Sequence, residues 1–213
     1  MVNYLARLGW SHGDQEIFSR DELVRLFDVK DVASSGAVFD QAKLEWLNQE
    51  SMKRMDDRRL ADLAAPFIER AGLPVPADGD WLARVVATLK ERAKTLVELV
   101  EVGRFYFAAP TGYDSKAAEK LFTSEGTRRL ALLIDALSTQ PDFRANSLEH
   151  MYRELAELHG LKLTDLAQVS RLAVTGTTVS PPIFEVLALL GRDEALTRLR
   201  AAQAAARYPE SPA

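Results

Sequence analysis

The stretch RRLADLAAPFIERAGLP, residues 58–74, decides the fold class of this chain. Its apolar residues recur at intervals of three and four, which places them on one face of an α-helix: Leu60, Leu63, Ala64, Phe67 and Ile68. Gly72 follows where a left-handed residue commonly ends a helix, and Pro74 cannot continue one. The pattern predicts a helix from Arg58 to Ala71 that packs through one face.

The same helical spacing extends over most of the chain, whereas alternation with a period of two hardly occurs. Ser19 and Glu22 form a capping-box pattern that predicts the start of a short helix. We therefore predict an all-α, multihelical fold. One long helix is expected from Trp81, capped by Asp80, to about Phe107, with Gly103 as its only weak point. Shorter helices are expected over Ala117–Leu121, Arg128–Leu137 and Leu148–His159. Two more are expected from Ser180-Pro181-Pro182 to Gly191 and from Glu194 to about Arg207.

Composition limits the possible functions. The chain has 213 residues, 27 Lys and Arg against 31 Asp and Glu, a net charge of −4 and no cysteine. The lack of cysteine excludes disulfides and thiolate chemistry, and the sequence lacks an apolar stretch long enough for a membrane span, so we expect a cytoplasmic protein without membrane contact. The mild acidity argues against binding of nucleic acid by bulk charge, so any such contact must be local.

Two polar segments carry residue types that are found in chemical sites. His12 to Glu16 brings an imidazole and carboxylates together, but the spacing fits no zinc pattern, and a polar turn explains it better than a hydrolase or metal site. The loop Thr175 to Thr178 lacks the spacing that wraps phosphates. We assign no catalytic residue and no metal ligand to this chain.

Basic residues form two groups near helical segments, and composition alone favours solvated helix faces over ligand contacts. The alternative is local recognition of phosphates or bases, for which the planar guanidinium of arginine is suited. The groups are Arg84, Lys90, Arg92 and Lys94, and Arg192, Arg198, Arg200 and Arg207.

Several long stretches resemble one family. They are residues 3–19 (NYLARLGWSHGDQEIFS), 38–48 (VFDQAKLEWLN), 91–96 (ERAKTL), 171–176 (RLAVTG) and 180–191 (SPPIFEVLALLG). Over residues 2 to 207 the chain is similar to the C-terminal half of bacterial glutamyl-tRNA synthetases. The resemblance implies a remainder of the stem-contact domain in residues 1–55 and two helical anticodon-binding subdomains in residues 56–104 and 105–213.

The catalytic half of that family, a class I nucleotide-binding fold with H-I-G-H-like and K-M-S-K-S-like motifs, has no counterpart here. We therefore expect part of a longer ligase that couples glutamate to tRNA with ATP and magnesium. The chain alone is expected to be non-catalytic and to need no cofactor. The implied partner is the anticodon arm of tRNA(Glu), bound by a monomer, with no role for DNA.

The resemblance also assigns site residues. Arg92 matches the arginine that reads the third anticodon base, and Arg171 matches one that contacts the anticodon loop. Ser180, Pro181 and Ile183 match the loop and helix start around the anticodon bases, where free amides, the prolines and Ile183 are expected to contact unpaired bases. The alternative function is a helical protein-interaction module derived from a synthetase half.

Overall fold

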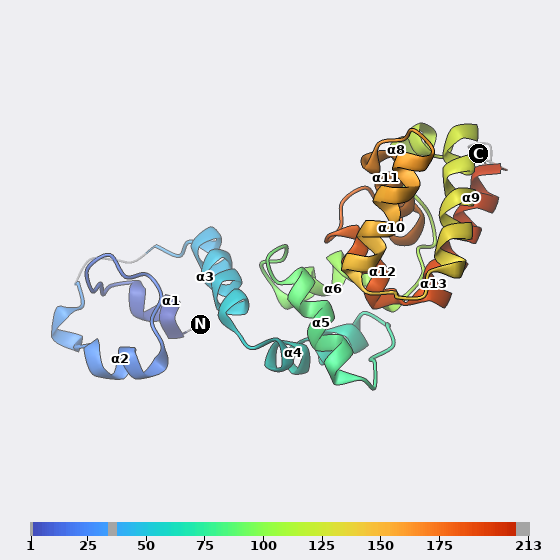
Figure 1. The fold of residues 1–213 in the computed structure, drawn as a ribbon. Coiled ribbons are helices and arrows are strands. Elements are labelled where there is room, and N and C mark those ends of the chain that lie inside the picture. The colour runs from blue at the N-terminus through green and yellow to red at the C-terminus, as the bar shows by residue number, and fades with distance from the viewer. Residues whose placement is uncertain (1, 34–37, 208–213) are drawn as a thin grey trace.

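The computed structural model describes residues 2–33 and 38–207, and within these ranges it contains helices and no β-strand. The prediction of an all-α fold is confirmed. The helices lie along an elongated molecule, with α1 and α2 at one end and α8 to α13 at the other (Figure 1). They are α1 Val2–Arg7, α2 Arg20–Leu26, the 3₁₀ helix η1 Val29–Asp31, α3 Gln41–Arg54, α4 Asp57–Arg70, α5 Gly79–Leu89, α6 Leu96–Val102, α7 Arg104–Phe107, α8 Ser115–Leu121, α9 Ser124–Thr139, α10 Ala145–Leu158, α11 Leu163–Thr175, α12 Ile183–Leu190 and α13 Arg192–Arg207.

Helix α4 is the helix that residues 58–71 predict. Asp56 caps it by accepting a hydrogen bond from the Arg59 amide, and Gly72 has the left-handed φ of 71° that the C-terminal turn requires. Leu60, Ala64 and Ile68 are fully buried on the face that packs against α5 and α6. The apolar stripe therefore identified the helix and the centre of its buried face, whereas Leu63, expected on that face, is 44% exposed.

The prediction of one long helix from Trp81 to Phe107 is wrong. The chain turns after Leu89, and α6 begins at Leu96 because Thr95 accepts a hydrogen bond from the Glu98 amide while the Glu98 carboxylate accepts one from the Lys94 amide. Gly103 separates α6 from α7. These breaks place residues 90–95 in a turn rather than on a helix face.

The start of α5 also differs from the prediction. Asp78, and not Asp80, is the cap, since its carboxylate accepts hydrogen bonds from the amides of Asp80 and Trp81. The Trp81 indole donates to the Leu189 carbonyl at 2.7 Å, which ties α5 to the end of α12. This contact joins the middle of the chain to its C-terminal helices.

A buried arginine organises the C-terminal helices. Arg198, in α13, is 3% exposed and donates to the carbonyls of Phe105 at 2.6 Å and Val174 at 2.9 Å, while its Nε contacts Glu194. The expectation that Arg198 lies on a solvated face is therefore wrong. Its guanidinium instead links the ends of α7 and α11 to α13.

The N-terminal region, residues 2–33, has a small core of its own made by Trp10, Phe18 and Leu23. The capping box of Ser19 and Glu22 is present at the start of α2, as predicted. Residues His12 to Glu16 form the expected turn, in which the Gln15 amide donates to the His12 carbonyl and Glu16 pairs with Arg7 and Lys43.

Helix α3 connects this region to the rest of the molecule through polar contacts. The side-chain amides of Asn48 and Gln49 donate to the carbonyls of Lys94 and Glu91, and Lys53 pairs with Glu91. A continuous group of buried residues then runs from Met52 to Ala202, across the expected division at residue 104. The boundaries at residues 55 and 104 stay predictions.

Candidate nucleic-acid interface

A groove of about 520 Å³ lies where the C-terminal end of α6 and the start of α7 face the loop between α11 and α12. Gly176 ends α11 with a φ of 79°, and the chain then turns back toward α12. The groove therefore combines side chains that are far apart in sequence. Its lining residues are Arg92, Glu101, Val102, Arg104, Phe105, Thr175, Thr177, Val179, Ser180 and Pro181.

Arg92 stands at one side of this groove with an exposed side chain. It lies in the turn between α5 and α6, where its amide donates to the Leu89 carbonyl and the next residue, Ala93, is fully buried. Its neighbours Lys90 and Lys94 are engaged in ion pairs with Asp57 and Glu45. Among the described residues no ion pair involves the Arg92 guanidinium, and Arg92 is one of the residues that line the groove.

Arg171, in α11, is half-buried behind the loop. Its Nη1 donates to the Pro181 carbonyl at 2.8 Å, to the Ser180 carbonyl at 3.2 Å and to the Ser180 hydroxyl. Burial, and to a smaller extent the positive charge of Arg92, lower the pKa of the Arg171 guanidinium. The two arginines are thus close enough to interact, and Arg171 holds the shape of the loop that forms one wall of the groove.

Ser180 and Pro181 are buried residues that line the groove. The helix expected from Ser180-Pro181-Pro182 begins only at Ile183, after Pro182, and it has no side-chain cap. The Ser180 hydroxyl is instead engaged by Arg171 and donates to the Pro181 carbonyl. Its contribution to the groove is therefore loop geometry.

Ile183 occupies a different environment from the one expected. Its side chain is 3% exposed and belongs to the main hydrophobic core. The side chain therefore cannot provide a stacking surface for bases, and it anchors the first turn of α12 instead. Pro182, directly before it, is exposed.

Seven lining residues were not predicted as site residues: Glu101, Val102, Arg104, Phe105, Thr175, Thr177 and Val179. Glu101 and Arg104 lie on either side of the helix break at Gly103, and their side chains form a 3.8 Å ion pair at the surface. The sequence signal that could have indicated Glu101 and Arg104 is Gly103, since a glycine between two helical segments can change the direction of the residues on either side of it. Thr177 and Val179 are exposed loop residues whose place depends on the turn at Gly176.

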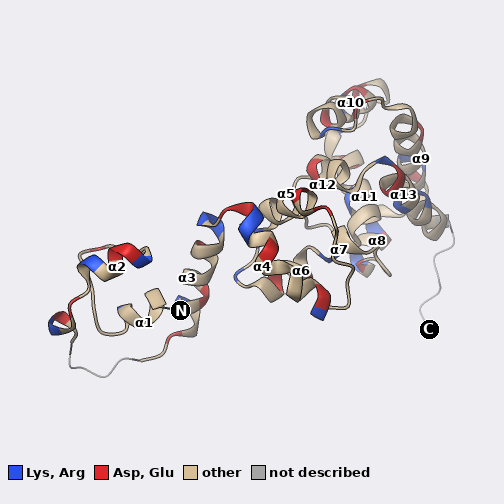
Figure 2. Ribbon diagram, turned by 90° about the horizontal axis from the view of Figure 1, so that it is seen from below, with Lys and Arg blue, Asp and Glu red and all other residues tan. Residues whose placement is uncertain are grey.

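The second basic group contributes no common site. Arg192 lies over the Phe143 ring and donates to the Gln140 carbonyl, and Arg198 is buried as described above. Basic and acidic residues are interspersed along the helices (Figure 2). In the part of the chain that the structure describes, no group of three potential metal ligands occurs, and no helix is long and apolar enough to cross a membrane.

Comparison with known proteins identifies the region that contains the groove. A family model described as "Anticodon binding domain" matches residues 59–203, about two thirds of the chain. The chain belongs to the anticodon-binding domain family. The match includes Arg92, Arg171, Ser180, Pro181 and the groove residues contributed by α6 and α7.

Similarity to curated proteins extends over almost the whole chain. The chain is 44% identical to the glutamate–tRNA ligase of Geotalea uraniireducens over 96% of its own length, and 48% identical to glutamate–tRNA ligase 2 of Rhodospirillum rubrum over 94%. It spans only 44% and 43% of those two relatives. The part that it matches is the C-terminal, anticodon-binding part.

Solved structures agree with this assignment. A glutamate–tRNA ligase from Elizabethkingia meningosepticum, crystallised with its amino acid, superposes with a TM-score of 0.87 and 28% identity, over 95% of this chain and 40% of that one. A glutamate–tRNA synthetase from Elizabethkingia anophelis gives a TM-score of 0.82 and 27% identity. The predicted resemblance to glutamyl-tRNA synthetases is confirmed.

Proposed function

We propose that this chain recognises the anticodon arm of tRNA(Glu) and that the groove between α6, α7 and the loop 176–182 receives anticodon bases. The observation that carries the proposal is the convergence of Arg92, Ser180 and Pro181 on one groove within a domain of the anticodon-binding family. Single-stranded RNA is usually read through unstacked bases that enter such grooves.

Arg92 is the base-reading residue in this proposal. Its guanidinium is exposed beside the groove, and a planar fork of donors can bond two acceptors of one base edge. The third anticodon base is the one that the family resemblance assigns to this position.

Arg171 has a supporting role. Because its Nη1 donors are used by Ser180 and Pro181, Arg171 shapes the loop and adds positive charge behind it. The net charge of −4 does not oppose binding, since placed arginines rather than the total charge contact the RNA.

The chain acts as a monomer in the cytoplasm in this proposal. ATP and magnesium would act in the part of a glutamate–tRNA ligase that this chain does not match.

The proposal is tested by titrating the chain with an RNA hairpin that carries the glutamate anticodon arm, at two salt concentrations. We expect binding that weakens as salt rises, because phosphate contacts release counterions. Arg171→Ala should weaken binding, whereas Arg25→Ala, on an exposed part of α2, should not.

Absence of binding to the hairpin and to whole tRNA would contradict the proposal. The protein-interaction module remains the second candidate, since an apolar groove lies in the N-terminal region. A protein partner bound without measurable RNA affinity would favour it.

A further inference from the structure

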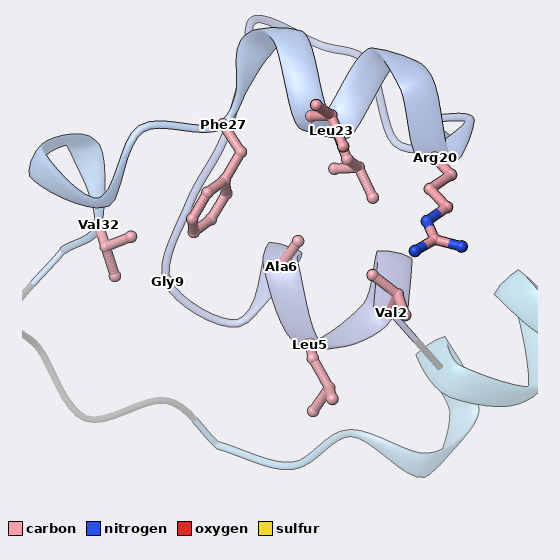
Figure 3. A pocket seen from close by; sticks show the side chains of 9 residues that line it. Val2, Leu5, Ala6, Gly9, Arg20, Leu23, Phe27 and Val32 are labelled. Carbon is pink, nitrogen blue, oxygen red and sulfur yellow. The ribbon is translucent and has the colours of Figure 1, made fainter.

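Helix α3 lies between two parts of this molecule (Figure 1). On one side is the region of α1 and α2, which has an apolar groove of about 530 Å³ (Figure 3). On the other side are α4 to α13, which fall almost entirely within residues 59–203 of the anticodon-binding family, whereas α3 lies outside that match. Side chains of α3 nevertheless contact the turn that carries Arg92. A helix outside the family match therefore touches the part of the domain to which base reading is assigned.

In this turn, residues 90–95, two backbone carbonyls accept hydrogen bonds from side chains of α3. Gln49 Nε2 donates to the Glu91 carbonyl at 3.2 Å, and Asn48 Nδ2 donates to the Lys94 carbonyl at 2.5 Å. Backbone carbonyls beyond the end of a helix lack their regular partners and need others. Helix α3 thus supplies two of the hydrogen bonds that define the path of the turn.

The hydrogen bond from Gln49 falls on the peptide group directly before Arg92. The Glu91 carbonyl and the Arg92 amide belong to this one planar group. The carbonyl accepts from Gln49, while the amide donates to the Leu89 carbonyl at 2.8 Å. Because the group is planar, a rotation of it would disrupt both hydrogen bonds. The direction in which the Arg92 side chain leaves the backbone therefore depends on Gln49.

Ion pairs hold the neighbours of Arg92 against the same helix. Lys94 pairs with Glu45 at 3.6 Å, and Glu91 pairs with Lys53 at 3.3 Å. Exposed pairs of this kind each contribute little, so the two side-chain amides are the more important contacts. Among the described residues no ion pair involves Arg92 itself. Helix α3 therefore restrains both sides of Arg92 and leaves its guanidinium available to a base.

We infer that Gln49 and Asn48 are positioning residues for base discrimination by Arg92. The inference rests on the proposed function, and it extends the specificity of the anticodon groove to a helix outside the family match. A guanidinium discriminates between base edges only when its donors are held within about 0.5 Å of the required geometry. Loss of the α3 contacts therefore reduces the preference between RNAs more than the affinity for RNA.

Gln49→Met tests the inference in the full chain, because methionine has a similar length and no donor. The variant is titrated with two RNA hairpins, one with the glutamate anticodon and one with its third base replaced. Gln49→Met should reduce the preference for the first hairpin at least about threefold, as expected for the loss of one hydrogen bond. Binding of the second hairpin should change little. Asn48→Ala should reduce the preference in the same direction.

Three further variants separate positioning from a merely structural role. Gln41→Met is the matched control in the same helix, since the Gln41 amide donates to Glu45 within α3, and it should leave the preference unchanged. Gln49→Lys has a donor of similar reach and should retain the preference. In an Arg92→Gln background, Gln49→Met should have no further effect on the preference, because the group that it positions is gone.

Hydrogen exchange of the free chain provides a measurement without RNA. The Arg92 amide should exchange at least about threefold faster in Gln49→Met, while amides of α9 should not change.

Three results would overturn the inference. The first is a preference that Gln49→Met leaves intact, and the second is equal weakening of both hairpins by this variant. The third is unchanged exchange of the Arg92 amide. If the chain without substitutions showed no preference, the base-reading role of Arg92 would fail instead, and hydrogen exchange would still decide whether α3 holds the turn.

Discussion

The two ends of this chain bury their apolar residues in different ways. In the C-terminal helices α8 to α13, buried side chains belong to one core that continues from Met52 to Ala202. In the N-terminal region, α1 and α2 share a core of three buried residues, and polar contacts such as Asn3 with Glu16 and Phe18 hold the loop in place. Periodic apolar residues thus build a stable core at one end and an uncovered groove at the other.

This difference predicts how each end responds to substitution. Changes in the C-terminal core should shift the global unfolding transition, whereas changes in the N-terminal region should act locally. The following predictions test that contrast, beginning with the largest expected effect.

Arg198→Met should destabilise the protein by about 3 kcal/mol, because it leaves the buried carbonyls of Phe105 and Val174 without their donor. Urea unfolding followed by circular dichroism measures the change. Arg200→Met, at an exposed position of the same helix, should stay within about 0.5 kcal/mol of the unchanged protein. Equal effects of the two substitutions would show that Arg198 does not organise this core.

Trp10→Ala should remove the centre of the N-terminal core, where the indole packs against Phe18 and Phe27. Amides of α1 and α2 should exchange at least about tenfold faster, while the main unfolding transition shifts by no more than about 0.5 kcal/mol. Hydrogen exchange and urea unfolding measure both quantities. A large shift of the main transition would show that the two ends unfold together.

The smallest effect concerns the capping box of α2. The pKa of Glu22 is lowered, chiefly because its carboxylate accepts a hydrogen bond from the Ser19 amide. A carboxylate with a lowered folded-state pKa stabilises the folded form above its ordinary pKa, and this contribution disappears as the pH falls through the folded-state value. Protection of the Ser19 and Glu22 amides should therefore decrease as the pH falls below the ordinary pKa of a glutamate side chain.

Glu22→Gln should flatten this pH dependence, whereas Glu119→Gln, in α8, should leave it in place. Nuclear magnetic resonance of the α2 amides provides the measurement. An unaltered pH profile in Glu22→Gln would exclude the capping box as its source.

Local signals predicted much of the fold. The apolar stripe of α4, its glycine stop and the capping box of α2 depend on residues close in sequence, so the sequence alone reveals them. Helix α11 was not predicted, because residues such as Val169, Ser170 and Ala173 are buried around several of its faces and leave no single apolar stripe. The break before α6 was missed although Thr95 and Glu98 carry a helix-start signal.

The residues of the candidate site could not be predicted from the residues next to them in the sequence. Arg92, Arg171, Ser180 and Pro181 were found through family resemblance, since Arg92 lies about 80 to 90 residues before the other three and a separation of that length carries no local signal. The burial of Ile183 and Arg198 depends on helices that pack from distant parts of the chain. Such contacts can be seen only in the folded molecule.

The most direct test of base reading by Arg92 compares two RNA hairpins, one with the glutamate anticodon and one with its third base replaced. The unchanged chain should prefer the first hairpin, and Arg92→Gln should reduce that preference by about 1–3 kcal/mol. The same titrations of Arg25→Ala, whose side chain is exposed on α2, should leave the preference unchanged. If Arg92→Gln weakened binding of both hairpins equally, Arg92 would contact the backbone and the groove would not read this base.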